Sequence, residues 1–324
     1  MDSVADEVKV GVVEVGTGAA AAGAAVEFAE ASPETCTYAL TLGYNGAPFA
    51  GFARQPGRLT VQGNVEEALS LLLKCSVQTV CAGRTDAGVH ARQQVVSFEV
   101  PKQAVAGRSK RTLLRSLNAL THEMITVKNI DQRPAGFSAR FDAVSREYRY
   151  FICTDATPPL FMRDFSWHIP KPLNVEAMQQ AAALLEGEHD FKSFCLAASA
   201  KDKPTCRYVE KVLIEPAQIM EENFLVITVR GNAFLHSMVR TMVGTLVRVG
   251  AGHREPEWIS RVLEARNRSA AAETAPACGL VFWAVNYEGE RCPYAPVYST
   301  SSQNAPAQGE LSTVTPAQKS SEGE

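Results

Sequence analysis

The sequence has no closely spaced pair of cysteines. Its eight cysteines stand at positions 36, 75, 81, 153, 195, 206, 278 and 292, so none forms a CxxC pair, and no histidine lies at a zinc-site spacing from such a pair. These spacings argue against a structural metal site and against a disulfide framework. They predict reduced thiols that are mostly buried as small apolar side chains.

Long apolar runs are also missing. Arg, Glu or Gly interrupts each apolar stretch well before the roughly 18 residues that a membrane-spanning helix needs. The first ten residues, MDSVADEVKV, are acidic, unlike a secretory signal or an Arg-rich transit peptide. We therefore expect a cytoplasmic protein that does not contact a membrane.

The chain as a whole has no excess of positive charge, since its net charge is −3 over 324 residues. The two ends hold ten of the 35 acidic and only two of the 32 basic residues, which leaves a net charge of +5 in residues 36–292. Affinity for phosphate depends on local basic surface and not on whole-chain charge. The central segment therefore permits an RNA partner without requiring one.

Composition divides the chain into four parts. Residues 1–35 are acidic and contain the run GTGAAAAGAA, and residues 291–324 are rich in Ser, Thr, Pro, Ala and Gln, so both are predicted to be flexible tails. Between them, residues 36–144 and 145–290 each show strand patterns alternating with helix patterns. This order predicts two α+β halves of similar size, with a catalytic site in the cleft between them.

The expected elements follow from hydrophobic periodicity. Strands are predicted at Tyr38–Tyr44, Gln94–Val100, Arg146–Thr154, 207–215, 223–231 and Leu280–Tyr287, and helices at Val61–Leu73, Arg111–Leu120, Val175–Leu185 and Leu235–Val249.

The segment CAGRTDAGVHA, at residues 81–91, is the most informative for chemistry. Gly83 and Gly88 bracket a tight loop of the kind that lets the backbone approach a ligand closely. Inside the loop, Arg84 is a cation two residues from the Asp86 carboxylate, and such a partner would keep an aspartate ionised for work as a nucleophile or base. On spacing alone, however, a turn carrying a surface ion pair is the more common meaning.

The motif GRTDAGVHA resembles the active-site motif of the TruA family of tRNA pseudouridine synthases. Segments that are similar to the same family follow in the same order and together cover residues 36–290: YNGAPFAG at 44–51, TVQGNVEEAL at 60–69, FSARFDAVSREYRY at 137–150, GEHDFKSF at 187–194, NAFLHSMVRTMVGTLVRVG at 232–250 and PACGLVFWAVNY at 276–287.

The resemblance implies roles for four residues. Asp86 matches the catalytic aspartate, Arg84 the arginine beside it, Tyr148 the tyrosine that packs against the target base, and Arg240 the arginine that pairs with the aspartate. It also implies an α+β fold whose two related halves form a continuous, mostly antiparallel sheet with helices packed on it. The implied protein is a homodimer that needs no metal, nucleotide or other cofactor and acts on uridines at tRNA positions 38 to 40.

Other polar residues near these motifs have less specific interpretations. Arg108, Lys110, Arg111 and Arg115 form a basic cluster on a predicted helix, which is either a solvated face or a phosphate contact, and in an RNA enzyme we expect Arg111 and Arg115 to bind the substrate. His90 and His236 are more typical of structural histidines than of phosphate ligands.

Two other function classes remain as alternatives. Residues 8–21, a strand pattern followed by GTGAAA, imitate a dinucleotide-binding turn, but no second parallel βα unit follows, as a Rossmann domain would require. A non-catalytic RNA-binding module built on an inactive synthase would be favoured if Asp86 were replaced, and Asp86 is present.

Overall fold

The computed structural model describes residues 34–196 and 203–290, so the two predicted tails and the GTGAAA turn lie outside the described residues, apart from the last two residues of the first tail. A mostly antiparallel sheet organises the described part of the chain. Its ten strands are β1 (Thr35–Tyr44), β2 (Val80–Cys81), β3 (His90–Pro101), β4 (Ile125–Arg133), β5 (Ala143–Cys153), β6 (Trp167–His168), β7 (Gly187–Asp190), β8 (Cys206–Ile219), β9 (Glu222–Gly231) and β10 (Leu280–Tyr287).

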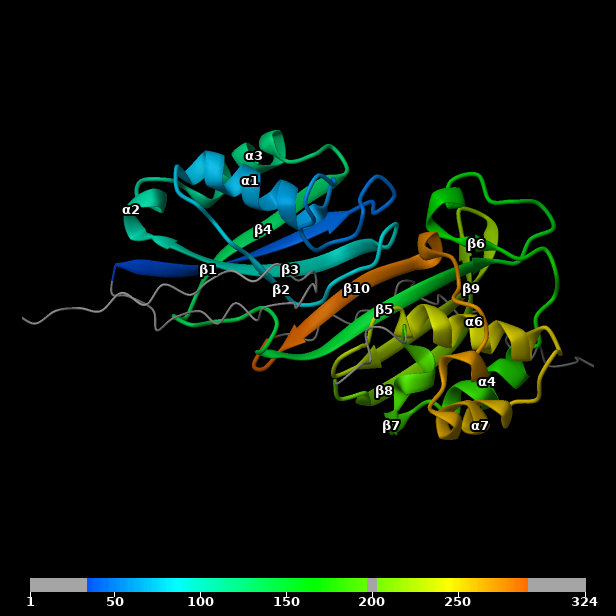
Figure 1. The fold of residues 1–324 in the computed structure, drawn as a ribbon. Helices are drawn as coiled ribbons and strands as arrows, with labels where there is room; N and C mark the ends of the chain where they lie inside the picture. Colours follow the sequence, from blue (N-terminus) through cyan, green and yellow to red (C-terminus); the bar gives the residue numbers. More distant parts are fainter. Residues whose placement is uncertain (1–33, 197–202, 291–324) are drawn as a thin grey trace, which may run out of the picture.

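The sheet is continuous across the two halves, in the order β4-β1-β3-β10-β5-β9-β8-β7. The last strand of the chain, β10, joins them: it runs parallel to β3, where Phe282 lies opposite Ala91, and antiparallel to β5, where Phe282 lies opposite Tyr148 (Figure 1). The α+β fold with one sheet shared by two halves is thereby confirmed.

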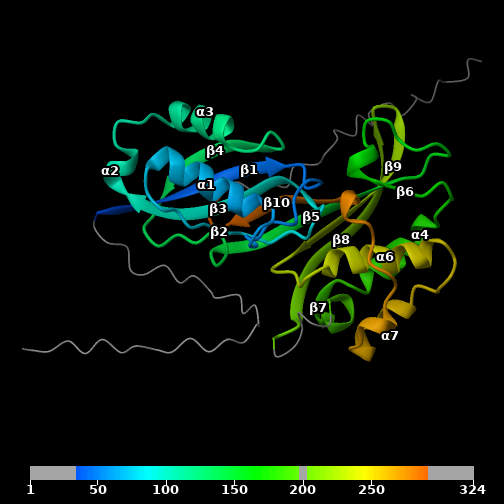
Figure 2. The same cartoon turned by 45° about the horizontal axis from the view of Figure 1, so that its top comes forward.

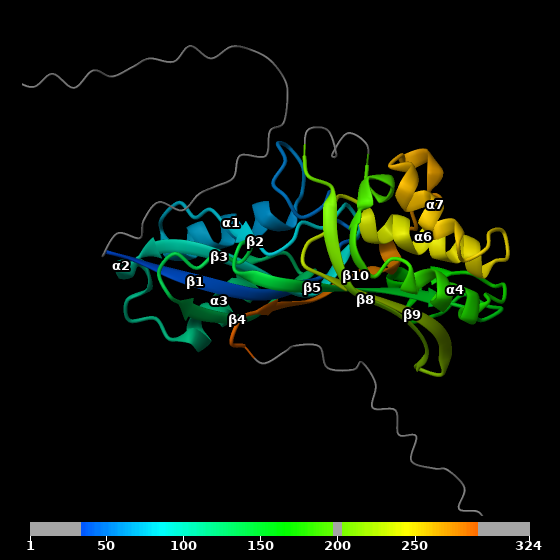
Figure 3. The same ribbon diagram turned by 90° about the horizontal axis from the view of Figure 1, so that it is seen from below.

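Helices cover the sheet and enclose the main core. They are α1 (Val61–Leu73), α2 (Lys102–Val105), α3 (Lys110–Leu120), α4 (Val175–Ala183), α6 (Met238–Gly250) and α7 (Trp258–Ala265). Figure 2 shows α1 and α3 on the N-terminal half and α4, α6 and α7 on the C-terminal half, with β10 and β5 between the two groups. In the view of Figure 3, α1, α6 and α7 lie on the same side of the sheet.

Sequence periodicity explains these positions. In α1, Val61, Val65 and Leu69 recur at a spacing of four, and each is about 1% exposed. The helix begins where the Thr60 hydroxyl accepts a hydrogen bond from the Gly63 amide, a standard N-cap. Along β3, five consecutive residues from Gln94 to Phe98 are buried, as expected for a central strand that is covered on both faces.

Several elements differ from the sequence prediction. The predicted α6 begins at Leu235, whereas the observed helix begins at Met238, because Ser237 adopts a left-handed conformation (φ 59°) and the Met238 amide bonds to the Leu235 carbonyl. Strand β4 and helix α7 are not predicted at all. Strand β4 lies at the edge of the sheet and carries Lys128, Asn129 and Asp131, which weaken its apolar alternation.

No helix among the described residues combines the length and the apolar character that crossing a membrane would require.

Candidate active site

Asp86 lies in the loop that joins β2 to β3, and its neighbour Thr85 fixes that loop. The Thr85 side chain is buried and shares a 2.8 Å hydrogen bond with the Tyr44 hydroxyl of β1. The Thr85 carbonyl accepts a 3.0 Å hydrogen bond from the Phe52 amide. Because both the side chain and the backbone of Thr85 are held, the next residue has a defined position.

Gly83 and Gly88 of the motif are each required by the structure, for different reasons. A Cβ atom on Gly83 would lie 2.9 Å from the Phe282 ring, so only glycine lets β10 pack this closely on the loop. The Gly83 carbonyl accepts a 2.6 Å hydrogen bond from the Gln94 side chain. Gly88 has φ 76°, the left-handed conformation that turns the chain from Asp86 back into β3.

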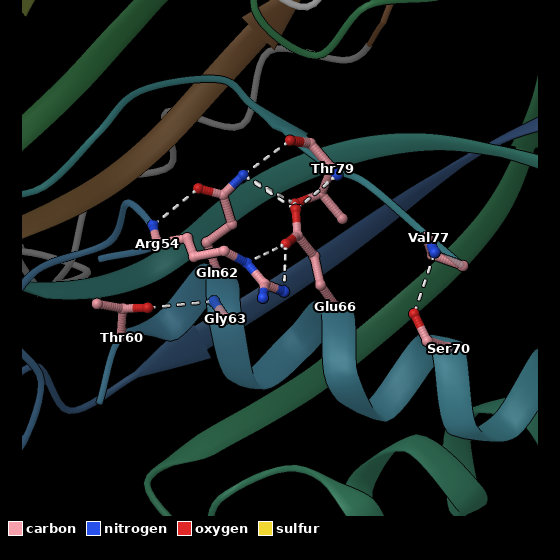
Figure 4. A network of polar contacts seen from close by, with 8 residues as sticks. All are labelled: Arg54, Thr60, Gln62, Gly63, Glu66, Ser70, Val77 and Thr79. Atoms are coloured by element: carbon pink, nitrogen blue, oxygen red, sulfur yellow. Dashed lines mark hydrogen bonds and ion pairs between the residues drawn. The ribbon is translucent and has the colours of Figure 1, made fainter. Parts of the chain in front are cut away.

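A polar network around the buried Glu66 holds the chain just before β2, the strand that leads into this loop (Figure 4). Glu66 of α1 is 5% exposed, and its Oε1 accepts hydrogen bonds from the Thr79 amide at 2.8 Å and from the Thr79 hydroxyl at 3.0 Å. Its Oε2 accepts from Arg54 Nε at 2.9 Å and lies 2.7 Å from Arg54 Nη2. Glu66 therefore ties α1 to the residue before β2 and to the segment that follows Phe52.

The Asp86 carboxylate faces residues that are about 150 positions away in the sequence. Its Oδ2 accepts hydrogen bonds from Ser237 Oγ at 2.8 Å and from Arg240 Nη1 at 3.0 Å, and its Oδ1 lies 3.3 Å from His236 Nε2. Ser237 and Arg240 belong to the N-terminal end of α6, where the helix dipole favours negative charge. These contacts hold the carboxylate in place. Because its side chain is 20% exposed, it also remains open to a ligand.

Arg240 is itself held in place by the segment that passes over α6. Its Nε donates a 2.9 Å hydrogen bond to the Ala275 carbonyl, and the Ala275 amide donates a 3.1 Å bond back to the Arg240 carbonyl. Nε thus fixes the position of the guanidinium, and Nη1 binds Asp86. The planar group can do both because its donors point in fixed directions.

Tyr148 extends from β5 toward the same loop. Its ring meets Phe234 and Phe282 edge-on, at centroid distances of 5.1 Å and 5.0 Å. Burial raises the pKa of the Tyr148 phenol well above its ordinary value, so the hydroxyl stays protonated. Within the described residues, no hydrogen-bond partner of this hydroxyl is present, which leaves it available to a ligand.

Asp86 forms its ion pair with Arg240, the arginine that the family resemblance pairs with it, and not with Arg84, which is nearer in the sequence. Arg84 is exposed and, in the part of the chain that the structure describes, forms no ion pair, whereas Arg240 contacts Asp86 directly. The interpretation of Arg84 as the partner of Asp86 is therefore wrong. Thr85 turns inward between them, so neighbours in this loop face different ways, and Arg84 presents its guanidinium to solvent.

The two histidines differ from each other. His90 is 1% exposed, and its Nδ1 accepts a 3.0 Å hydrogen bond from the Gly46 amide. Burial lowers the pKa of His90, so it is a neutral structural residue, as expected. For His236 the structural interpretation is wrong, because its side chain is 48% exposed and adjoins Asp86.

Ser237 is the contact that the sequence does not reveal. A serine before an apolar helix pattern indicates an N-cap, yet the Ser237 side chain caps no helix amide and donates to Asp86 instead. The feature of the sequence that could have indicated this contact is the position of Ser237 three residues before Arg240, since both residues lie in the first turn of one helix.

The arrangement contains no obvious place for a metal ion. Among the described residues, no group of three or more His, Cys, Asp or Glu side chains is positioned to hold one. Cys81, five residues before Asp86, is also unsuited to nucleophilic work, because burial raises the pKa of its thiol to about 11. The chemistry available here is that of one carboxylate, its cationic and hydroxyl donors, and a buried phenol.

The known proteins that this chain resembles are tRNA pseudouridine synthases. Residues 181–288 match the model of a family described as tRNA pseudouridine synthase. The chain is 42% identical to tRNA pseudouridine synthase A of Halalkalibacterium halodurans over 243 residues, which are 75% of this chain and 89% of that protein. It is 40% identical to the same enzyme of Thermotoga neapolitana, over 75% of this chain and 96% of that one, and 40% identical to that of Bacillus subtilis, over 76% and 98%.

Proposed function

The chain belongs to the TruA family of tRNA pseudouridine synthases, and we propose that it isomerises uridine at positions 38 to 40 of the tRNA anticodon stem-loop, with Asp86 as its catalytic nucleophile. The observation that carries this proposal is the Asp86 carboxylate itself, which is partly exposed beside Arg240, Ser237 and Tyr148 where the two halves meet.

The reaction requires few chemical groups. The bond between N1 of uracil and C1′ of the ribose breaks, the uracil turns, and C5 bonds to C1′; C5 then loses its proton, and N1 carries one. A target base stacked in a stem must first leave the stack. A carboxylate serves this reaction by adding covalently or by stabilising positive charge on the sugar, and both roles depend on its negative charge.

The surrounding residues take supporting roles in this proposal. Arg240 and Ser237 hold the carboxylate through Oδ2, which leaves Oδ1 and the approach past His236 for the substrate. The Tyr148 ring supplies a face for the loosened uracil, and its hydroxyl supplies a hydrogen bond to a base edge. Exposed Arg84 lies in the same loop, where its guanidinium can contact RNA phosphate.

Arg111 and Arg115 are proposed to contact the tRNA backbone. Both are exposed and stand four residues apart on α3, hence on one face of the helix, while Lys110 is paired with Asp131 at 2.6 Å. We expect tRNA affinity to fall log-linearly with salt concentration, and Arg111→Ala with Arg115→Ala to weaken binding to all tRNAs and flatten that slope by about one unit per lost contact. Filter binding at several salt concentrations measures both. A parent slope near zero would contradict the choice of RNA as substrate.

Chelation is expected to leave the activity intact. The proposed site works through a carboxylate, an arginine, a serine and a tyrosine, so turnover after exhaustive EDTA treatment should match the untreated enzyme. Because tRNA folding uses magnesium, magnesium is added back to both samples before pseudouridine is counted. Turnover that EDTA abolishes and only zinc restores would show that a metal takes part.

We also propose that the protein acts in the cytoplasm, as its composition suggests, and that it forms a homodimer, as the family resemblance implies. Light scattering of the full chain, alone and with tRNA, measures the assembly.

The direct test of the function is to incubate the purified protein with unmodified tRNA and map pseudouridine by chemical adduct formation and primer extension. New stops confined to positions 38 to 40 are the expected result. The alternative class, a non-catalytic RNA-binding module, predicts tRNA binding with no stop at any position.

A further inference from the structure

A second concave site lies at the C-terminal end of α6, the end opposite Asp86. It is a pocket of about 460 Å³, and its lining consists of Arg248, His253, Arg254, Trp258, Ser269, Ala270, Ala271 and Ala272. Because a helix rises about 1.5 Å per residue, Arg248 lies about 15 Å along the helix axis from Met238, where the carboxylate site begins. Figure 1 shows this end of α6 leading to α7 at the outer edge of the C-terminal half.

The helix end shapes the pocket. Gly252 adopts φ 73°, its amide bonds to the Val249 carbonyl, and the His253 amide bonds to the Arg248 carbonyl at 3.0 Å, which is a Schellman cap. The cap folds His253 back over Arg248, whose Nη1 donates to His253 Nδ1 at 3.3 Å. A guanidinium has donors only, so Nδ1 accepts and the Nε2 proton remains available as a further donor.

Arg248 and Arg254 give this pocket its positive charge. Arg248, His253 and Arg254 are exposed, and no ion pair involves any of them within residues 34–196 and 203–290. Glu255 and Glu257 are the adjacent acids; both are exposed, and neither forms an ion pair with the pocket arginines. An anion entering the pocket therefore meets two guanidinium groups without displacing a carboxylate.

An aromatic ring completes the site. Trp258 begins α7 and is partly exposed, and the Arg254 guanidinium lies 5.4 Å from the centre of its ring. Arginines without an ion-pair partner beside a partly exposed aromatic ring form a combination that can bind nucleotides, since a phosphate pairs with arginine and a base stacks on an aromatic ring.

The opposite wall is held rigidly. Arg268 donates to the Ala272 carbonyl at 2.9 Å and to the Thr274 hydroxyl at 3.0 Å, and the Ala272 amide donates to the Thr245 hydroxyl at 3.3 Å. These bonds fix the 269–272 segment on α6, so the pocket is formed before any ligand arrives. Preformed sites lose less affinity to ordering on binding.

We propose that this pocket binds a nucleotide of the tRNA other than the target uridine, with its phosphate between Arg248 and Arg254 and its base against Trp258. The proposal rests on the proposed function, because it takes tRNA as the substrate. The pocket lies at the other end of α6 from Asp86, about 15 Å along the helix axis from Met238, so a nucleotide bound there lies farther along the RNA than the target uridine. The pocket would therefore fix the register of the RNA along the C-terminal half.

The test replaces the two arginines together, as Arg248→Ala with Arg254→Ala. We expect the Kd for tRNA to rise about tenfold and the salt slope to flatten by between about one and two units, while kcat at saturating tRNA stays at the parent value. Arg261→Ala is the matched control: it removes one arginine from the exposed face of α7 outside the pocket lining and should leave the Kd within about twofold. Thermal midpoints show that all variants fold.

Two outcomes would overturn the inference. The first is a double variant that binds tRNA as the parent does; if that variant also loses binding of uridine monophosphate, the pocket takes a free nucleotide instead. The second is a loss of tRNA affinity no larger than that of Arg261→Ala. If the parent binds tRNA and forms no pseudouridine, the proposed function fails, and the pocket is still judged by the Kd values alone.

Discussion

Asp86→Asn is expected to abolish pseudouridine formation, by about 10⁴-fold or more, and to leave folding and tRNA binding near the parent values. The amide oxygen can take the place of Oδ2 and keep the hydrogen bonds from Ser237 and Arg240. The amide nitrogen then takes the place of Oδ1, which lies 3.3 Å from His236 Nε2. The variant therefore keeps the geometry of the site but loses the negative charge and the nucleophilicity of the carboxylate.

Three measurements together make this result specific. Pseudouridine counting gives the rate, gel shift gives the tRNA affinity, and a thermal scan gives the midpoint of unfolding. Asp131→Asn is the matched control, because it makes the same chemical change in an exposed ion pair with Lys110 and should not alter the rate. An Asp86→Asn variant that keeps a tenth of the parent rate, or one inactive because it has unfolded, would refute the assignment of Asp86.

The sequence located the central carboxylate and missed part of its surroundings for a physical reason. The GRTDAGVHA motif identifies Asp86, but in an irregular loop no periodicity tells which way each side chain faces. By spacing, Arg84, two residues away, looks like its partner; the family resemblance instead names Arg240, which is one of the two donors from α6. Ser237 and His236 reach Asp86 only because the halves are brought together, a long-range arrangement that local patterns do not encode.

The fold, too, could be predicted only in part from the sequence. Helix α1 and strand β10 have the predicted bounds, since a regular apolar pattern and a clear N-cap or strand composition mark them. The position of β10 between β3 and β5 could not be derived from periodicity alone, because pairing between distant strands depends on the packing of the whole sheet. That strand is also the one whose Phe282 packs on Gly83 and Tyr148 in the site.

Arg240→Lys is expected to lower kcat about 100-fold while tRNA affinity changes by less than about threefold. Arg240 donates from Nε to the Ala275 carbonyl and from Nη1 to Asp86, two acceptors that it reaches with different nitrogens. A lysine has one nitrogen, which cannot occupy both positions, so either the carboxylate or the segment over α6 loses its contact. The positive charge is kept, and general attraction to RNA is therefore preserved.

Rapid-quench single-turnover assays separate this loss in the chemical step from slow binding, and Arg261→Lys on α7 serves as the conservative control outside the site. The double variant Asp86→Asn with Arg240→Lys sharpens the test. If Arg240 acts by holding the carboxylate, its replacement should cost nothing further once the carboxylate is gone, because residues that act as one unit are not additive. A single variant that retains more than a third of the parent kcat would show that Arg240 does not position Asp86 for the reaction.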